Sequence, residues 1–320
     1  MPGTKIPLIQ LESNSIFSPS IPLNIFPPSI TPGMKAYLSL IKFSHTVFAL
    51  PFALVGYFLG IHTTGHSAQW SILGLVVLCM VFARSAAMAF NRYADKHIDA
   101  INARTKSREI PAGVISPNAA LLFVIISSAL FIVTTYFINP LCFYLSPVAL
   151  AVILGYSYTK RFTALSHFVL GLGLALAPVG AYLAVTGHFD LIPVLLGTVV
   201  LLWVGGFDII YALQDVSFDV QNKLHSIPVW LGTADALKLS SIAHLLSALI
   251  LVTLAILLPK SYGELGILLY LGTLIFIGLL WYQHRLVKPN DLSRVNLAFF
   301  TTNGIASIIF GLSCILDFYV

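Results

Sequence analysis

Two stretches of the sequence carry aspartates four residues apart, each directly after a long apolar run. Asp95 and Asp99 follow one run, with Asn91 four residues earlier, and Asp215 and Asp219 follow another. Because helical residues four apart lie on one face, each set is predicted to line one stripe of a helix that emerges from an apolar segment. Converging carboxylates raise one another's pKa, and a divalent cation would relieve that repulsion.

The chemistry that these carboxylates predict is the binding of a metal-held diphosphate. Oxygen ligands of this kind suit Mg²⁺, which keeps some of its waters and bridges to phosphate oxygens. Cations close to the acidic stretches would then meet a multiply charged anion. These cations are Arg104, Arg108, Lys160, Arg161 and Lys223. One D-x-x-x-D alone would fit a solvated helix end equally well, but two copies, each beyond an apolar run, favour a site.

Arg84 stands inside an apolar run, seven residues before Asn91. It should therefore lie on the same helix face, about two turns deeper. An arginine inside a membrane costs about 2.5–3.5 kcal/mol unless it is paired or faces water. We therefore expect a polar pocket to continue into the bundle and to hold a second ligand. The alternative is a structural arginine that bonds a helix carbonyl or an aspartate.

The composition identifies the elements that must position these residues as membrane helices. The 320 residues are 58% apolar and only 9% charged, with a mean hydropathy of +0.92. Soluble domains carry about 25% charged residues, so the chain is predicted to be an integral membrane protein. The net charge of +5 does not indicate nucleic acid, because the cations lie in short loops between apolar runs. Three single cysteines are interpreted as small buried apolar residues.

Nine apolar segments of about 20 residues are predicted to span the membrane. They cover residues 38–60, 70–91, 119–138, 141–158, 166–185, 191–213, 239–258, 264–283 and 297–316. Small residues at 171–184 ("GLGLALAPVGAYLA") favour close helix packing there. Residues 1–35, rich in proline and serine, are predicted to form a disordered or surface-lying extension, and residues 36–320 a single transmembrane domain.

The connections between these segments differ sharply in charge. Fifteen cations fall on the side of the amino-terminal tail: Lys5, Lys35, Lys42, Arg92, Lys96, Arg104, Lys106, Arg108, Lys160, Arg161, Lys223, Lys238, Arg285, Lys288 and Arg294. The other side holds only Lys260. Lysine and arginine accumulate on cytoplasmic loops, so the amino terminus and the long acidic loops are predicted to be cytoplasmic.

These motifs resemble the UbiA superfamily of intramembrane aromatic prenyltransferases. The family's first signature, N-x-x-x-D-x-x-x-D, is matched by Asn91, Asp95 and Asp99, and the basic stretch after it by Arg104, Thr105, Arg108, Pro111 and Gly113. The second signature, D-x-x-Y-x-x-x-D-x-x-x-D, is matched by Asp208, Tyr211, Asp215 and Asp219. Tyr156, Lys160 and Arg161 match its Y-x-x-x-K-R, and Arg84 matches an arginine of the 4-hydroxybenzoate branch. Glu109 departs from the family, because many relatives have proline there.

The resemblance implies an all-α bundle of about nine transmembrane helices around a central polar cavity that opens to the cytoplasm and sideways to lipid. It implies Mg²⁺-dependent transfer of a polyprenyl group from polyprenyl diphosphate to a ring carbon of 4-hydroxybenzoate or 1,4-dihydroxy-6-naphthoate, in ubiquinone or menaquinone biosynthesis. The implied location is a bacterial inner membrane.

The resemblance also assigns a role to each site residue. Asn91, Asp95, Asp99, Asp215 and Asp219 would hold metal, and the four aspartates with Arg161 would be catalytic. Arg104, Arg108, Lys160, Arg161 and Lys223 would bind diphosphate, and Arg84, Asp208 and Tyr211 would bind the aromatic acceptor.

Two alternatives remain open from the sequence. A secondary transporter also places ionisable residues inside the membrane, although transporters tend to place them near the midplane in repeated halves. A prenyltransferase that acts on haem or a chlorophyll precursor would differ only in its acceptor.

Overall fold

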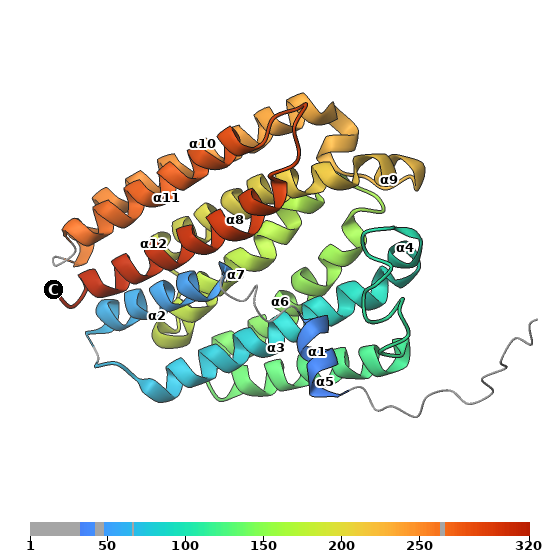
Figure 1. The fold of residues 1–320 in the computed structure, drawn as a ribbon. Coiled ribbons are helices and arrows are strands. Elements are labelled where there is room, and N and C mark those ends of the chain that lie inside the picture. The colour runs from blue at the N-terminus through green and yellow to red at the C-terminus, as the bar shows by residue number, and fades with distance from the viewer. Residues whose placement is uncertain (1–32, 42–47, 66, 263–265) are drawn as a thin grey trace, which may run out of the picture.

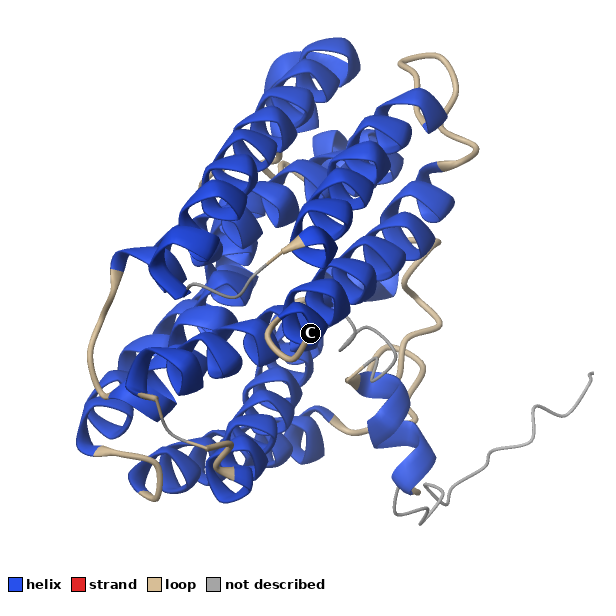
Figure 2. Ribbon diagram, turned by 90° about the vertical axis from the view of Figure 1, so that its left-hand side faces the viewer, coloured by secondary structure: helices blue, strands red, loops and turns tan. Residues whose placement is uncertain are grey.

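The apolar segments form long helices that lie side by side, as a computed structural model of the chain shows (Figure 1). The structure describes residues 33–41, 48–65, 67–262 and 266–320. The helices are α1 (Met34–Leu40), α2 (Leu50–Thr64), α3 (Trp70–Ala94), α4 (Lys96–Ile101), α5 (Pro117–Tyr136), α6 (Pro140–Thr159), α7 (Ser166–Thr186), α8 (Leu191–Ala212), α9 (Val216–Gln221), α10 (Ile227–Tyr262), α11 (Ile267–Leu286) and α12 (Asn303–Asp317). A 3₁₀ turn, η2 (Leu213–Asp215), follows α8, and a π-helical turn, η3 (Leu297–Thr302), precedes α12. Helices and loops make up the fold of the described chain (Figure 2).

Several helix ends follow local sequence signals. Ser116 and Asn139 stand directly before Pro117 and Pro140, and each side chain accepts a hydrogen bond from a backbone N–H in the first helical turn. Proline suits the first position of a helix, because its missing N–H would be unpaired there anyway, and serine and asparagine are strong caps. These dipeptides set the starts of α5, after a long loop, and of α6, after a short connection.

Eight helical stretches within the described residues are long and apolar enough to cross a membrane. The helix α2 is also apolar but has only 15 residues. The predicted first segment, 38–60, contains the end of α1 and most of α2, while residues 42–47 lie outside the described residues. The predicted extension at 1–35 also lies almost entirely outside them and stays a prediction.

Because it has several helices of membrane-spanning length and composition, the chain is an all-helical, multi-pass integral membrane protein.

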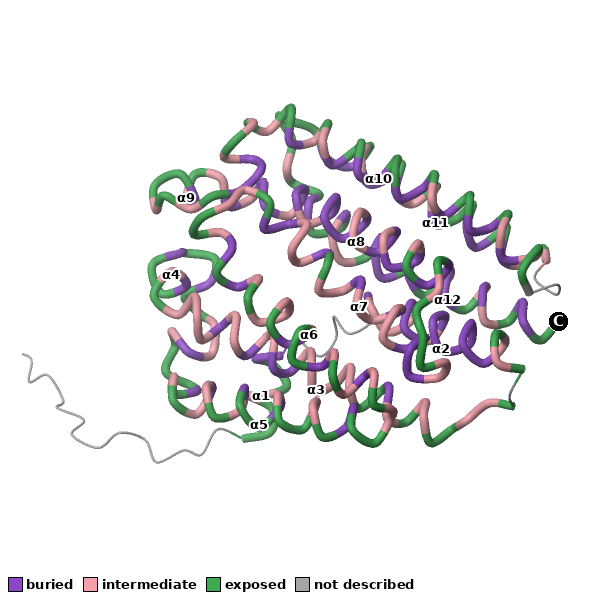
Figure 3. The backbone as a smooth tube through the Cα atoms, turned by 180° about the vertical axis from the view of Figure 1, so that it is seen from behind, coloured by how far each residue is buried: buried purple, intermediate pink, exposed green. Residues whose placement is uncertain are grey.

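The core lies around α8, which is buried along most of its length between α7 and α10 (Figure 3). Its Trp203 is fully buried among the rings of Phe52, Phe207 and Phe276. Outward-facing side chains of α10 are apolar and exposed: Leu245, Leu246, Leu249, Val252 and Ile256. Such an apolar outer surface suits contact with lipid chains, because the helices satisfy their own backbone hydrogen bonds.

Small residues let α2, α7 and α8 approach closely. A Cβ on Gly56 would overlap the Pro178 carbonyl oxygen, and one on Gly171 would overlap the Leu201 carbonyl oxygen. The packing role predicted for residues 171–184 is thus confirmed at Gly171. It is the absence of side chains at these two glycines that permits the contact between the backbones.

We expect Gly56→Ala to destabilise the bundle by about 1–3 kcal/mol, because overpacking forces helices apart. Gly74→Ala is the matched control, since a Cβ there meets open space and alanine favours a helix by up to about 1 kcal/mol over glycine. Thermal unfolding in detergent measures both variants. Equal midpoints for the two would contradict the close contact of α2 and α7.

Candidate active site

Each acidic stretch lies where a long helix ends and a short one begins. Asp95 separates α3 from α4 with φ −94° and ψ 8°, and Asp215 separates α8 from α9 with φ −106° and ψ 2°. Asp99 and Asp219 then lie in the first turns of α4 and α9. The predicted single helical stripe is therefore divided at its first aspartate in both stretches. Aspartate favours helix ends, because its side chain competes for nearby backbone groups.

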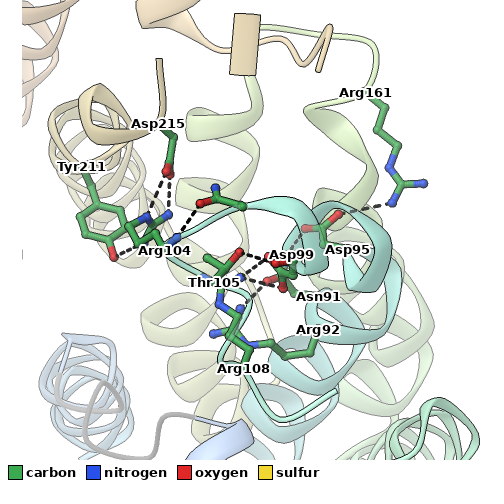
Figure 4. A network of polar contacts seen from close by, with 11 residues as sticks. Asn91, Arg92, Asp95, Asp99, Arg104, Thr105, Arg108, Arg161, Tyr211 and Asp215 are labelled. Atoms are coloured by element: carbon green, nitrogen blue, oxygen red, sulfur yellow. Dashed lines mark hydrogen bonds and ion pairs between the residues drawn. The ribbon is translucent and has the colours of Figure 1, made fainter. Parts of the chain in front are cut away.

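The two short helices lie at the same end of the bundle, opposite the carboxyl terminus (Figures 1 and 3). The loop that follows α4 also carries Arg104 to the second acidic stretch. Its guanidinium donates from Nε to Oδ1 of Asp215 over 3.0 Å and pairs through Nη2 with Oδ2. Its Nη1 donates to the Tyr211 hydroxyl over 2.9 Å (Figure 4). Arg104 thus joins residues that are more than 100 positions apart in the sequence.

Two neighbouring cations, Lys160 and Arg161, form a second connection between the acidic stretches. Arg161 Nη2 lies 3.3 Å from Asp95 Oδ1 and also donates to the Ala94 carbonyl. Lys160 Nζ lies 4.0 Å from Asp219 Oδ2. The two cations are neighbours in the loop between α6 and α7. This loop therefore contacts Asp95, next to α4, and Asp219, in α9.

Asp99 completes the set, because Arg108 Nη1 donates to its two oxygens over 2.7 and 2.8 Å. Asn91 donates to Asp95 over 3.1 Å and accepts from the buried Arg92 (Figure 4). Each of the four predicted metal-binding aspartates therefore has a lysine or arginine partner. The exposed Lys223, by contrast, forms no ion pair within the described residues and has a left-handed φ of 54°.

The aspartates are largely withdrawn from water, with Asp99 4%, Asp215 8% and Asp219 2% exposed. Burial raises the pKa of Asp95 above its usual value, and the nearby charge of Asp99 adds to this effect, while Arg161 opposes it. Acidic groups held this way stay charged only where cations compensate them. The observed pairs supply that compensation.

The donor set fits a hard divalent cation. Within the described residues, no three histidine, cysteine or acidic side chains are gathered closely enough to hold a metal ion, since the carboxylates turn to their cations instead. The available ligands are carboxylate and amide oxygens, which Mg²⁺ prefers. One of them, the buried Oδ2 of Asp219, accepts no hydrogen bond. Lys160 Nζ lies 4.0 Å from this oxygen, beyond hydrogen-bond distance, so the oxygen can still act as a ligand.

A cavity of about 350 Å³ lies between α3, α5, α6 and α7. Arg84 and Tyr156 line it. Most of its other walls are apolar, whereas the sequence predicted a polar cavity. Thr135 and Ser146 add further polar groups, while most of the other lining side chains are those of leucine, valine, alanine and isoleucine.

The remaining predicted acceptor residues lie on α8. Tyr211 stacks on Phe299 of the π-helical turn, with ring centroids 4.1 Å apart, and Asp208 pairs with His167 at 2.7 Å. Sequence reasoning missed His167 and Phe299. A lone histidine at the start of an apolar helix gives little signal, although His167 does stand only six residues beyond Arg161.

Glu109, the departure from the family pattern, contacts the first helix. It accepts a hydrogen bond from Ser39 of α1, while its buried Oε2 has no hydrogen-bond partner. The substitution therefore ties α1 to the loop between α4 and α5.

Comparisons with known proteins show similarity along most of the chain. A sequence model described as the UbiA prenyltransferase family matches residues 49–305. Two similar proteins are the 4-hydroxybenzoate octaprenyltransferases of Aliivibrio fischeri strain MJ11 and Nitrosospira multiformis. The first is 32% identical over 76% of this chain and 82% of the relative, and the second is 30% identical over 78% and 83%.

Solved structures show the same fold. The apo structure of a UbiA homolog from Aeropyrum pernix K1 matches with a TM-score of 0.75 and 32% identity, over 86% of this chain and 98% of the homolog. A UbiA homolog from Archaeoglobus fulgidus bound to GPP and Mg²⁺ matches with a TM-score of 0.69 and 20% identity, over 89% of this chain and all of the other. The chain therefore belongs to the UbiA prenyltransferase family and is an enzyme.

Proposed function

We propose that this enzyme transfers a polyprenyl group from polyprenyl diphosphate to a ring carbon of a hydroxylated aromatic carboxylate. The candidate acceptors are 4-hydroxybenzoate and 1,4-dihydroxy-6-naphthoate. The names of the two curated relatives support the first acceptor. The observation that carries the proposal is the meeting of both acidic stretches with Arg104, Lys160 and Arg161 at one end of the bundle.

The paired charges can bind the diphosphate by exchange. Asn91, Asp95, Asp99, Asp215 and Asp219 would hold Mg²⁺, which when bound neutralises charge on the diphosphate oxygens. The cations now paired with these aspartates would then be free to turn to the same oxygens. Arg104 and Arg161 suit this task, because a guanidinium can present two parallel N–H donors to phosphate.

Charge stabilisation on the leaving group drives the reaction. The bond between the allylic carbon and the diphosphate oxygen breaks, and the electron pair leaves with the diphosphate, beside Arg104, Arg108, Lys160 and Arg161. A ring carbon of the acceptor supplies the electron pair for the new carbon–carbon bond. The carboxylate of Asp208 takes the hydroxyl proton as this bond forms. The hydrogen on the attacked carbon then leaves as a proton and the oxygen is protonated again, which restores the aromatic ring and the hydroxyl. Tyr211, one turn along α8, would orient the ring.

The apolar cavity suits the isoprenoid tail. Each CH₂ kept out of water contributes about 0.8 kcal/mol, so an apolar chamber holds a long tail at little cost. Walls of this kind also keep water from the allylic cation. Arg84 would bind the acceptor's carboxylate at the polar end of the chamber.

The direction of insertion follows from the loop charges. The connections rich in lysine and arginine would face the cytoplasm of a bacterium, together with the amino terminus and the diphosphate site. The site carboxylates gather at one end of the bundle, which favours transfer chemistry over the ion pathway of a transporter.

Purified protein in detergent tests the proposal directly. It is incubated with polyprenyl diphosphate, Mg²⁺ and either acceptor, and products are identified by mass spectrometry. We expect a prenylated arene, and no product after chelation of the metal. Hydrolysed donor with every aromatic acceptor left unmodified would contradict the proposal.

We expect Arg84→Ala to raise KM for the acceptor by about 10²-fold, because a charged hydrogen bond of 1.5–3 kcal/mol is lost, while KM for the diphosphate changes little. Steady-state kinetics with each substrate varied in turn measures both constants. Arg84→Lys keeps the charge and should retain part of the affinity. An effect on the diphosphate alone would move Arg84 to the donor site.

A further inference from the structure

His167 lies at the start of α7 and has no exposed surface. Its ring connects two other elements. Nδ1 lies 2.7 Å from Oδ2 of Asp208 on α8, and Nε2 accepts the backbone N–H of Ile227, the first residue of α10, over 3.3 Å. Both ring nitrogens therefore have partners at the end of the bundle where the acidic stretches meet.

These two contacts fix the position of the ring proton. A neutral imidazole has one donor nitrogen and one acceptor nitrogen. Because the Ile227 N–H can only donate, Nε2 must be the acceptor. Nδ1 consequently carries the proton and donates it to the Asp208 carboxylate, a charge-assisted hydrogen bond.

The bond leaves one face of Asp208 available. Its side chain is 18% exposed, and Oδ1 has no hydrogen-bond partner within the described residues, while Oδ2 is held by the ring. Asp208 also precedes Tyr211 by three residues, so the two side chains lie on one face of α8. An oxygen held in this way can point at a ligand without rotating freely.

We infer that His167 is a positioning residue that holds Asp208 by Oδ2 and so directs Oδ1 toward the acceptor's hydroxyl. The inference rests on the proposed function, in which Asp208 accepts the hydroxyl proton as the carbon–carbon bond forms. His167 itself keeps its proton throughout and contacts no substrate. A fixed carboxylate loses less orientational freedom in the transition state than a mobile one.

The simpler reading is that His167 only secures the start of α10 through the Ile227 N–H. Substitutions separate the two readings. His167→Gln keeps a hydrogen-bond donor and an acceptor, on two atoms bonded to the same carbon. His167→Leu keeps a side chain of similar size and removes both the donor and the acceptor. A structural role would reduce stability and leave the rate per folded enzyme unchanged.

We expect His167→Leu to lower kcat by about 10²-fold, within the range for general base catalysis, with KM for the diphosphate unchanged. His167→Gln should restore most of kcat. In an Asp208→Asn background, His167→Leu should have no further effect, because it acts through Asp208. An equal loss in both backgrounds, or an unchanged kcat of His167→Leu, would overturn the inference.

A measurement without turnover separates this inference from the proposed function. Nitrogen-15 shifts of the histidine rings, assigned by loss of one signal in His167→Gln, should show a protonated Nδ1 and an unprotonated Nε2. The opposite tautomer would overturn the role of His167 even in an active enzyme. Absence of any transfer by the native protein, with the expected tautomer present, would overturn the proposed function instead.

Discussion

Replacing Asp215 by asparagine is expected to lower kcat/KM for prenyl transfer by about 10³-fold, the loss seen when one group that stabilises transition-state charge is removed. The amide is nearly the same size and can still accept a hydrogen bond from Arg104, so the fold should persist. What it cannot supply is the negative charge with which a carboxylate binds Mg²⁺. Initial rates over a range of Mg²⁺ concentrations measure the effect.

Asp235→Asn is the matched control for this change. Asp235 lies on α10, is well exposed and pairs only with Lys238 among the described residues. Its variant should keep the native rate and the native Mg²⁺ dependence. If Asp215→Asn behaved in the same way while the native protein was active, Asp215 would have no place among the metal-binding residues.

Arg104→Ala is expected to reduce kcat/KM by about 10²–10³-fold. This residue contacts both Asp215 and Tyr211, and it is the direct link from the first acidic stretch to the second. Its removal leaves Asp215 without its ion-pair partner. It also leaves the diphosphate without a guanidinium that can donate two parallel hydrogen bonds. Arg104→Lys keeps the positive charge but cannot donate two parallel hydrogen bonds, so we expect it to recover only part of the rate.

Arg285→Ala provides the comparison for Arg104→Ala. Arg285 lies in the last turn of α11, where it stacks over the exposed Trp281. Its loss should leave the kinetics unchanged. Equal rates for Arg104→Lys and Arg104→Ala would show that charge alone contributes nothing at this position, contrary to the exchange proposed for the diphosphate.

The acidic residues of the proposed site were identified from a local signal in the sequence. Spacing of four grouped Asp95 with Asp99 and Asp215 with Asp219, and among their cations only Arg108 lies near its partner, Asp99, in the sequence. The turns at Asp95 and Asp215 were not predicted, because the helix propensities of residues are a weak guide to where a helix is briefly interrupted. Likewise, the first predicted span, 38–60, contains parts of both α1 and α2.

Contacts between distant residues were beyond local reasoning. The pairing of Arg104 with Asp215 joins two loops, and the bond from His167 to Asp208 joins two helices. Either partner in such a pair has many alternatives in the sequence, and tertiary packing selects one; for His167 and Asp208 it is the packing of α7 against α8. The apolar character of the cavity was missed for the same reason, since it depends on which faces of four helices turn inward.

The pairing of each of the four predicted metal-binding aspartates with a cation also bears on what happens after pyrophosphate departs. A site with four carboxylates and no cationic side chains would need ions from solvent to compensate its negative charge. Here the guanidinium and ammonium groups can pair with the aspartates again, so the protein's own side chains balance the charge of the site. Recovery between turnovers should therefore depend little on the supply of monovalent salt.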